Sequence, residues 1–393
     1  MSLIATRTLD FIQLNPRFDK NMVRQQNYGA LDFFVQQTDA PNSIINEETK
    51  RRAFASIGNT VKIPVIAYDG EVSIANVRSC TIPANDNTSA LVTLTWVTYA
   101  TGFRMFPNLH LNNYITYQHD WNRKFEKMLR KLANTLDTAA IAALEAAKTQ
   151  VFKDTLIYTA SGNALQVPYN YREEILGDLN PIMHANDYMG DIHIIGNAGV
   201  DSLVRKLAQK GLYNEENKQL EYADKVFHFT NNLANASQKY GTLYAVEDGN
   251  VAVLSRIDRA ALAETKVTEA EEFGRVMLPV IGLEAGTHYK KVVGDVSDML
   301  SGDTSVADMK CDVVEYFGFS LDVCFLTAYN SAPATIANPI VKAQIGTPAA
   351  GTAAAQDVNV VAAAAQTIDT TTPLTVIVGN TTDSPVNTKE VSA

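Results

Sequence analysis

Residues 121–147 read WNRKFEKMLRKLANTLDTAAIAALEAA, the longest periodic stretch in the chain. Apolar side chains recur there every three or four residues, which is the repeat of one face of an α-helix. They are Trp121, Phe125, Met128, Leu132, Leu136 and Ala139. Because the alanines that follow favour helix, we predict one helix over 112–150, which at 1.5 Å per residue is about 55–60 Å long. A single helix of this length is typical of a strut on which a sheet is packed.

The outward stripe of this helix is basic, whereas the chain as a whole is acidic. This basic ridge consists of Arg123, Lys124, Lys127, Arg130 and Lys131. Over the 393 residues, 33 Lys and Arg stand against 43 Asp and Glu, a formal net charge of −10. That balance excludes a dedicated nucleic-acid binder, so any contact with DNA is expected to be local to the ridge. The solvated face of an ordinary amphipathic helix explains the ridge equally well.

The first 45 residues are rich in apolar side chains but show the repeat of neither a helix nor a strand. Turn-forming residues interrupt them every few positions, so we expect an extended arm whose apolar groups lie on another surface. Its candidate contacts are Phe11, Phe18, Phe33 and Phe34. The alternative is an N-terminal strand and turn packed on its own domain. A short charged helix is predicted next, over 46–56, from Glu and Arg residues spaced four apart.

From residue 58 the apolar residues alternate, as they do in β-strands. Two alternating runs lie on either side of a turn at 68–70, and a third β-like run covers 91–99. We predict a projecting hairpin with four candidate contact residues, Val61, Ile63, Val72 and Ile74. Pro64 places its strand at an edge or a bulge, because proline cannot donate a hydrogen bond to a central ladder.

A mixed α/β unit follows the long helix. Residues 191–196 form a predicted strand, and Asn197 is placed to cap a helix that ends at Gly211. Residues 312–326 are again β-rich and amphipathic. These patterns predict a sheet covered by at least one helix, with strands that return late in the chain.

Two further patterns concern a turn and the tail. The runs 241–246 and 251–254 flank Gly249 and predict a tight hairpin in which that glycine takes a positive φ. Residues 331–393 contain no aromatic side chain and many Ala and Thr. We expect a linker-like extension there that docks on the main body or on a neighbour, with 374–379 as one strand.

A search for catalytic signatures finds no phosphate loop, dinucleotide-binding turn, zinc-protease motif or nucleophile elbow, which lowers the odds of catalysis. Cys80, Cys311 and Cys324 are far apart and lack metal-ligand spacing. We therefore expect a reducing compartment, no metal and no cofactor. No signal sequence and no apolar run of membrane-spanning length is found, so we expect a soluble protein made in the cytosol.

One histidine has a position that invites a functional hypothesis. His193 lies in the strand before the capped helix, where α/β folds often place functional groups. A histidine on a half-buried strand remains the favoured explanation. The acidic runs at 173–178, 269–272 and 295–303 are expected to be solvated and not to form an acid–base pair or a Ca²⁺ loop.

The order of these elements resembles the major capsid proteins of tailed bacteriophages, an α+β architecture called the Johnson fold that encapsulins and the floor of herpesvirus capsids share. The most family-like segments are IIGNAGVDSLVRKLAQKGLY over 194–213 and the β-rich stretch 312–333. The resemblance implies an N-terminal arm over 1–56, an extended β-hairpin loop over 57–101, a peripheral domain with the spine helix over 102–165, an axial domain over 166–280 and peripheral return strands over 281–330. The Ala/Thr-rich extension over 331–393 departs from the family.

The resemblance implies a structural subunit without enzymatic activity, which self-assembles into the icosahedral shell around a double-stranded DNA genome. Its expected partners are neighbouring copies in hexamers and pentamers, portal, scaffold and decoration proteins, and packaged DNA facing the basic ridge; no membrane is expected. The expected location is the virion, after assembly in the host cytoplasm. Two alternatives stay open: an encapsulin-like compartment with a cargo groove, and a two-domain α/β enzyme, which a deep ionisable cleft would support.

Overall fold

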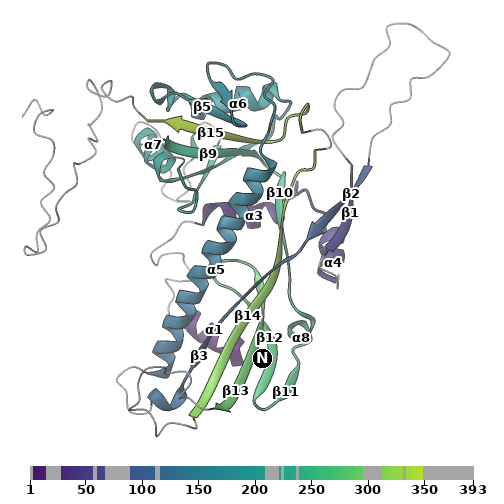
Figure 1. Cartoon of the computed structure of the whole chain (residues 1–393), viewed down its shortest axis with the longest axis vertical. Coiled ribbons are helices and arrows are strands. Elements are labelled where there is room, and N and C mark those ends of the chain that lie inside the picture. Colours follow the sequence, from purple (N-terminus) through teal and green to yellow (C-terminus); the bar gives the residue numbers. More distant parts are fainter. Residues whose placement is uncertain are drawn as a thin grey trace, which may run out of the picture.

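The computed structural model describes residues 3–14, 28–55, 60–66, 89–110, 116–208, 221–222, 225–235, 239–294, 312–330 and 333–347. They form sheets of two, six and seven strands, and helix α5 (Tyr117–Ala147) runs from the six-stranded sheet to the seven-stranded one (Figure 1). The mixed α+β class expected from the sequence is confirmed. Within these ranges no helix is long and apolar enough to cross a membrane.

Helix α5 is the predicted long helix, confirmed but shorter than expected. Thr116 caps its start by accepting the backbone N–H of His119 at 3.3 Å, and the backbone leaves the helical conformation at Lys148. The helix has 31 residues, about 46 Å at 1.5 Å per residue. Its end is defined by a tertiary contact, because Thr149 donates its backbone N–H to the carbonyl of Ile340 at 2.7 Å.

The six-stranded sheet is antiparallel and comprises β3 (Val97–Met105), β10 (Val251–Arg256), β11 (Lys266–Thr268), β12 (Glu271–Met277), β13 (Glu284–Gly294) and β14 (Asp312–Thr327). Strand β14 is its centre: β3 pairs along one edge, and β13 and β10 follow one another along the other. One face receives α5, whose Trp121 ring lies 5.7 Å from Phe103 and 6.1 Å from Phe317. The short helix α8 (Arg259–Leu262) lies on the other face.

The seven-stranded sheet has the order β4 (Thr159–Ser161), β5 (Ala164–Val167), β15 (Ile340–Gly346), β9 (Lys239–Glu247), β6 (Ile192–Gly196), β8 (Lys225–Phe229) and β7 (Glu221–Tyr222). Helices α6 (Ile175–Ala185) and α7 (Ala198–Ala208) lie between its strands in the chain order. Two 3₁₀ turns complete the described elements: Pro107–His110 lies between β3 and α5, and Tyr169–Tyr171 lies between β5 and α6. Asn197 caps α7 as predicted, because its Oδ1 accepts the N–H of Gly199 at 3.2 Å. Pairs β5–β15 and β6–β8 are parallel, and the other pairs are antiparallel.

The N-terminal region contains three described helices, α1 (Leu3–Leu14), α3 (Gly29–Thr38) and α4 (Glu47–Ala55). Helix α4 confirms the short charged helix. The prediction that the first 45 residues have no helical repeat is wrong. In α1 the buried residues Ile4, Thr8 and Phe11 follow a helical i, i+4, i+7 spacing. Helix α3 is buried nearly all round, and a helix enclosed on every side shows no amphipathic repeat.

The same helices correct three of the predicted contacts with neighbouring copies. Phe11, Phe33 and Phe34 are at most 2% exposed, so this chain itself covers them. Phe11 meets Phe125 edge to face at 5.1 Å between ring centroids, and Phe34 meets Phe325 in the same manner at 5.2 Å. The prediction of these three as inter-subunit contacts is therefore wrong. Phe18 lies outside the described residues.

The described part of the tail is not a linker. Residues 340–346 form β15, which lies between β5 and β9 in the middle of the seven-stranded sheet, and Ile340, Val341, Ala343 and Ile345 are at most 1% exposed. The linker-like character expected from 331 is wrong for this stretch, whereas the expected docking on the main body is confirmed, because β15 pairs with β5 on one side and with β9 on the other. Residues 348–393, with the expected strand at 374–379, lie outside the described residues.

The predicted hairpin around Gly249 is also wrong, although the glycine has the predicted positive φ of 79°. Strand β9 pairs with β6 and β15 in one sheet, whereas β10 pairs with β14 in the other. The turn therefore passes the chain from one sheet to the other. As a result, β10, β11 and β12, which precede residue 280, lie in the same sheet as β13 and β14, which follow it.

Candidate functional site

The basic ridge on α5 is narrower than the sequence suggests. Lys124 pairs with Asp120 at 2.8 Å and donates to the carbonyl of Arg104 at 3.1 Å, and Arg130 pairs with Glu126. Three cations remain exposed without a carboxylate partner among the described residues: Arg123, Lys127 and Lys131. They are four residues apart, so they form one line along the helix with steps of about 6 Å. This line can attract a polyanion such as DNA without reading its sequence.

Strands β1 (Thr60–Ile66) and β2 (Ser89–Thr95) form a two-stranded antiparallel sheet in which Thr60 lies opposite Thr95 and Ile66 opposite Ser89. Within the described ranges this hairpin pairs with no other strand. The predicted β-pairing in this region is confirmed for β1 with the 89–95 run, and the run that follows residue 70 lies outside the described residues. Val61 and Ile63 lie on β1, whereas Val72 and Ile74 lie outside the described residues. A two-stranded sheet has both edges open to another strand.

The hairpin has a firmly packed base. Trp96, between β2 and β3, is 6% exposed and packs with Ile45, Ala53, Ala252, Leu254 and Cys324 from α4, β10, β14 and the segment before α4. The guanidinium of Arg256 lies over its ring at 4.7 Å and forms an ion pair with Asp322 at 2.8 Å. Burial of such an aromatic anchor gives the hairpin a defined direction relative to the six-stranded sheet.

The face of the six-stranded sheet that turns away from α5 is only partly covered. The Trp96 cluster covers one end, and α8 covers the middle, where a Cβ on Gly286 would lie 2.9 Å from Ala261. The far end holds a hollow of about 730 Å³, which we call the open patch. It is lined by Gly102, Arg104, His288, Lys290, Val292, Tyr316 and Gly318. Phe103 and Phe317 also border it, but their rings pack against Trp121 on the α5 side of the sheet.

Glycines make the floor of the open patch, because Gly102 and Gly318 lie directly opposite one another on β3 and β14. Beside them His288 stacks on Phe273 with ring centroids 4.3 Å apart. The Nε2 atom of His288 lies 2.8 Å from Oε1 of Glu271, and this hydrogen bond lowers the pKa of the Glu271 carboxyl. Exposed apolar and aromatic surface around bare backbone is typical of a docking site for another polypeptide.

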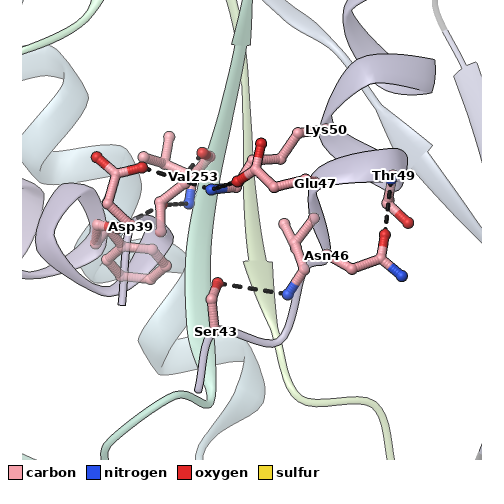
Figure 2. A network of polar contacts seen from close by, with 10 residues as sticks. Asp39, Ser43, Asn46, Glu47, Thr49, Lys50 and Val253 are labelled. Atoms are coloured by element: carbon pink, nitrogen blue, oxygen red, sulfur yellow. Dashed lines mark hydrogen bonds and ion pairs between the residues drawn. The ribbon is translucent and has the colours of Figure 1, made fainter. Parts of the chain in front are cut away.

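A second hollow of about 640 Å³ lies between α3, α4, β10 and β13. The Nζ atom of Lys50 in α4 lies 3.5 Å from Oδ1 of Asp39 at the end of α3 and 2.9 Å from Oε1 of Glu47 in its own helix (Figure 2). Thr38 at the end of α3 accepts the N–H of Val253 of β10 at 2.7 Å. These contacts tie α3, α4 and β10 together, so the hollow lies between packed elements of one subunit.

His193 lies in β6 as predicted, and the structure adds a partner that sequence reasoning missed. Its Nδ1 lies 3.1 Å from Nε2 of His228 in the neighbouring strand β8, and its Nε2 lies 3.5 Å from Asp248. The only signal in the sequence is that both histidines occur within short apolar strands. In the described part of the chain no group of three or more His, Cys, Asp or Glu could hold a metal ion.

The other sequence candidates are dispersed. Asp178 accepts a hydrogen bond from Tyr158 at 2.7 Å, and Glu173 lies 3.9 Å from Arg172. Cys324 is buried and not in a disulfide, and burial raises the pKa of its thiol to about 11. Cys80, Cys311 and the acidic run at 295–303 lie outside the described residues.

No protein-family model and no curated protein matches the sequence. Among solved structures, the chain is similar to a chain of Mycobacterium phage Che8 at 12% identity and a TM-score of 0.42, covering 76% of this chain and 88% of that one. It is similar to the capsid of Ralstonia phage GP4 at 8% identity and a TM-score of 0.43, covering 83% and 92%. It is also similar to a chain in the capsid structure of the cyanophage P-SCSP1u at 11% identity and a TM-score of 0.41, covering 75% and 85%.

Proposed function

We propose that the chain is a major capsid protein, a structural subunit that self-assembles into the icosahedral shell around the double-stranded DNA of a tailed bacteriophage. In this assignment α1, α3 and α4 belong to the N-terminal arm, the β1–β2 hairpin is the extended loop and α5 is the spine helix. The seven-stranded sheet is the axial domain, and the six-stranded sheet is the peripheral domain.

The proposal rests on two features of the same subunit: a projection that pairs with no other described strand, and a surface that no described residue covers. The β1–β2 hairpin pairs with no other described strand, and the open patch around Gly102 and Gly318 has no cover among the described residues. A projection on one copy and a receptive surface on the next make a head-to-tail contact. Contacts of this kind close into rings, and rings of five and six subunits close into a shell.

The basic ridge fits the inner surface of such a shell. Arg123, Lys127 and Lys131 would reduce the repulsion between packaged DNA and a subunit with a formal net charge of −10. Three cations are too few to bind DNA tightly, which suits a container that must later release its content. Portal, scaffold and decoration proteins complete the expected set of partners, with assembly in the host cytoplasm and the virion as final location.

The test is expression of the full chain, alone and with the genes beside it, followed by size exclusion and negative-stain microscopy. Shells or rings of five and six subunits support the proposal. A matched pair of variants then locates the contact: Gly318→Trp fills the open patch, whereas Glu269→Trp adds the same side chain at a carboxylate that is 94% exposed in the turn between β11 and β12. We expect the first variant to remain a folded monomer and the second to assemble.

Two outcomes would contradict the proposal. A stable monomer that turns over small molecules would favour the two-domain enzyme. Shells that hold a protein cargo and never DNA would favour the encapsulin-like alternative, and charge reversal of the ridge would then leave the loading of the shells unchanged.

A further inference from the structure

The β1–β2 hairpin joins the six-stranded sheet through one residue. Strand β2 ends at Thr95 and β3 begins at Val97, so Trp96 stands between a strand that pairs within the hairpin and a strand that pairs with β14. Within the described ranges the hairpin has no further strand partner to fix its direction (Figure 1). Residues 56–59, which lead from α4 to β1, lie outside the described residues. Among the described residues, the orientation of Trp96 therefore sets the direction of the hairpin.

A polar row of side chains crosses three neighbouring strands beside Trp96. Arg256 of β10 lies opposite Asp322 of β14, and Asp322 lies opposite Thr98 of β3. Side chains that lie opposite one another share a face of the sheet. The apolar residues one pleat further along the same strands belong to the Trp96 cluster. The polar row is thus the immediate neighbour of the Trp96 ring.

The polar row forms a closed circuit of contacts with that ring. The hydroxyl of Thr98 donates to Oδ1 of Asp322 at 2.6 Å, and Nε of Arg256 donates to Oδ2 of Asp322 at 2.8 Å. The guanidinium carbon of Arg256 lies 4.7 Å from the centroid of the Trp96 ring. Because Thr98 follows Trp96 by two residues, the circuit returns to its starting point. A guanidinium whose plane is held by a carboxylate fixes the tilt of the ring on which it lies.

The indole of Trp96 does not fix its own orientation by a hydrogen bond. Buried tryptophans usually find a partner for the indole N–H. In the described part of the chain, however, Nε1 of Trp96 is buried and has no hydrogen-bond partner. The apolar neighbours in the cluster keep the ring on the sheet, but apolar contacts are non-directional. The directional contact on the ring is the guanidinium of Arg256, whose side chain is 8% exposed.

We propose that Arg256 is the positioning residue of the hairpin: its guanidinium, held by Asp322 and Thr98, sets the tilt of Trp96 and with it the direction in which the β1–β2 hairpin leaves the subunit. Lysine cannot take this role, because an ammonium is a point charge and not a plane that pairs with a carboxylate and stacks on a ring at the same time.

The consequence for assembly rests on the proposed function, whereas the direction of the hairpin is a property of the single subunit. A head-to-tail contact closes into a ring only when the rotation from one copy to the next is fixed. A hairpin without a fixed direction would give rings of mixed size or open assemblies.

Distances between two spin labels on the unassembled full chain test the proposal. One label replaces Lys62, which is exposed on β1, and the other replaces Glu269, which is 94% exposed in the turn between β11 and β12. Labels attached to an unnatural amino acid leave the three cysteines untouched. We expect one narrow distance distribution in the unaltered chain and a roughly twofold broader one in Arg256→Lys, because the planar stack on the ring is lost.

Arg172→Lys is the matched control. The guanidinium of Arg172 lies 4.2 Å from the centroid of the Tyr169 ring, next to the seven-stranded sheet. The substitution thus removes the same kind of stack at a site away from the hairpin, and the distribution should stay narrow.

Thr98→Val separates positioning from stability. It removes the hydroxyl that orients Asp322 but keeps Arg256 and the volume of the side chain, so we expect a distribution of intermediate width. A structural role alone would lower the melting temperature of Arg256→Lys without broadening a distribution measured well below that temperature. Narrow distributions in both variants overturn the proposal. If Arg256→Lys does not fold, the width in Thr98→Val decides.

Negative-stain microscopy of the same variants, without labels, reports the consequence for assembly. We expect rings of mixed size or open assemblies from Arg256→Lys and normal shells from Arg172→Lys. Normal shells from a variant with a broad distribution would overturn the link to assembly. If the unaltered chain forms no rings, the proposed function fails, and the distance distributions still decide the role of Arg256.

Discussion

Substitution of Asp137 by Ala should destabilise the subunit by about 3 kcal/mol. The carboxylate of Asp137 accepts three hydrogen bonds, from Leu31, Thr230 and Asn232. Two of those donors, the amide of Leu31 and the hydroxyl of Thr230, are buried, and an unpaired buried donor costs about 1–3 kcal/mol. Asn232 is half-buried and can turn to water. Burial, and then the charge of Asp137, raise the pKa of the Asp32 carboxyl in α3 to about 7, so relief of that repulsion returns a part of the loss.

Urea unfolding of the unassembled subunit at pH 7, followed by fluorescence, measures this free energy, because Trp121 on the same helix is fully buried. Asp137→Asn keeps one acceptor oxygen, so we expect a loss of about 1–2 kcal/mol. Asp120→Ala is the control, since it removes a partly exposed ion pair from the same helix and leaves no fully buried donor unpaired, so it should cost about 1 kcal/mol or less. A variant Asp137→Ala as stable as Asp120→Ala would refute the view that this carboxylate holds α3, α5 and the end of β8 together.

Three further outcomes follow from the geometry. Charge reversal of Arg123, Lys127 and Lys131 to Glu should leave folding and shell formation intact but lower the DNA content of filled particles, measured as the ratio of absorbance at 260 and 280 nm. The same reversal at Lys124 and Arg130 should also lower the melting temperature of the subunit, because it breaks the ion pairs of these residues with Asp120 and Glu126. Gly29→Ala should destabilise the chain by several kcal/mol, because its Cβ would lie 2.5 Å from the carbonyl oxygen of Phe229. The control Gly177→Ala in α6 places its Cβ in open space and should be neutral or stabilising by up to about 1 kcal/mol. Equal melting temperatures of the two variants would contradict the tight fit at Gly29. Gly318→Trp should abolish assembly while circular dichroism stays that of the unaltered subunit, and normal shells from this variant would show that the open patch faces solvent.

The candidate assembly surfaces were partly readable from the sequence. The sequence pattern predicted the basic ridge but overestimated the number of its unpaired cations. The sequence did contain the information needed to see this, because Asp120 and Glu126 each precede a ridge cation by four residues, which is the spacing of an ion pair on a helix. The hairpin was found because strand alternation is local. The open patch was not found, because its two floor glycines are 216 positions apart and meet only through the register of β3 on β14.

Local patterns determined the parts of the fold that depend on neighbours in sequence. The apolar stripe of α5, the Asn197 cap of α7 and the long strand β14 each follow from side chains within a few residues of one another. Helix α1 belongs to this group as well, since its buried residues have an ordinary helical spacing that the surrounding polar residues obscured.

Only the tertiary structure decided which elements share a sheet and which apolar residues are covered. Residues 340–346 form a central strand because they pair with β5 on one side and with β9 on the other, and the turn at Gly249 separates β9, which pairs with β6 and β15, from β10, which pairs with β14. Helix α3 is buried over most of its surface, so its sequence shows little of the amphipathic repeat that marks a helix. The physical reason is common to all three: backbone pairing and burial join segments that are distant along the chain, whereas periodicity reports only the side of one element that is covered.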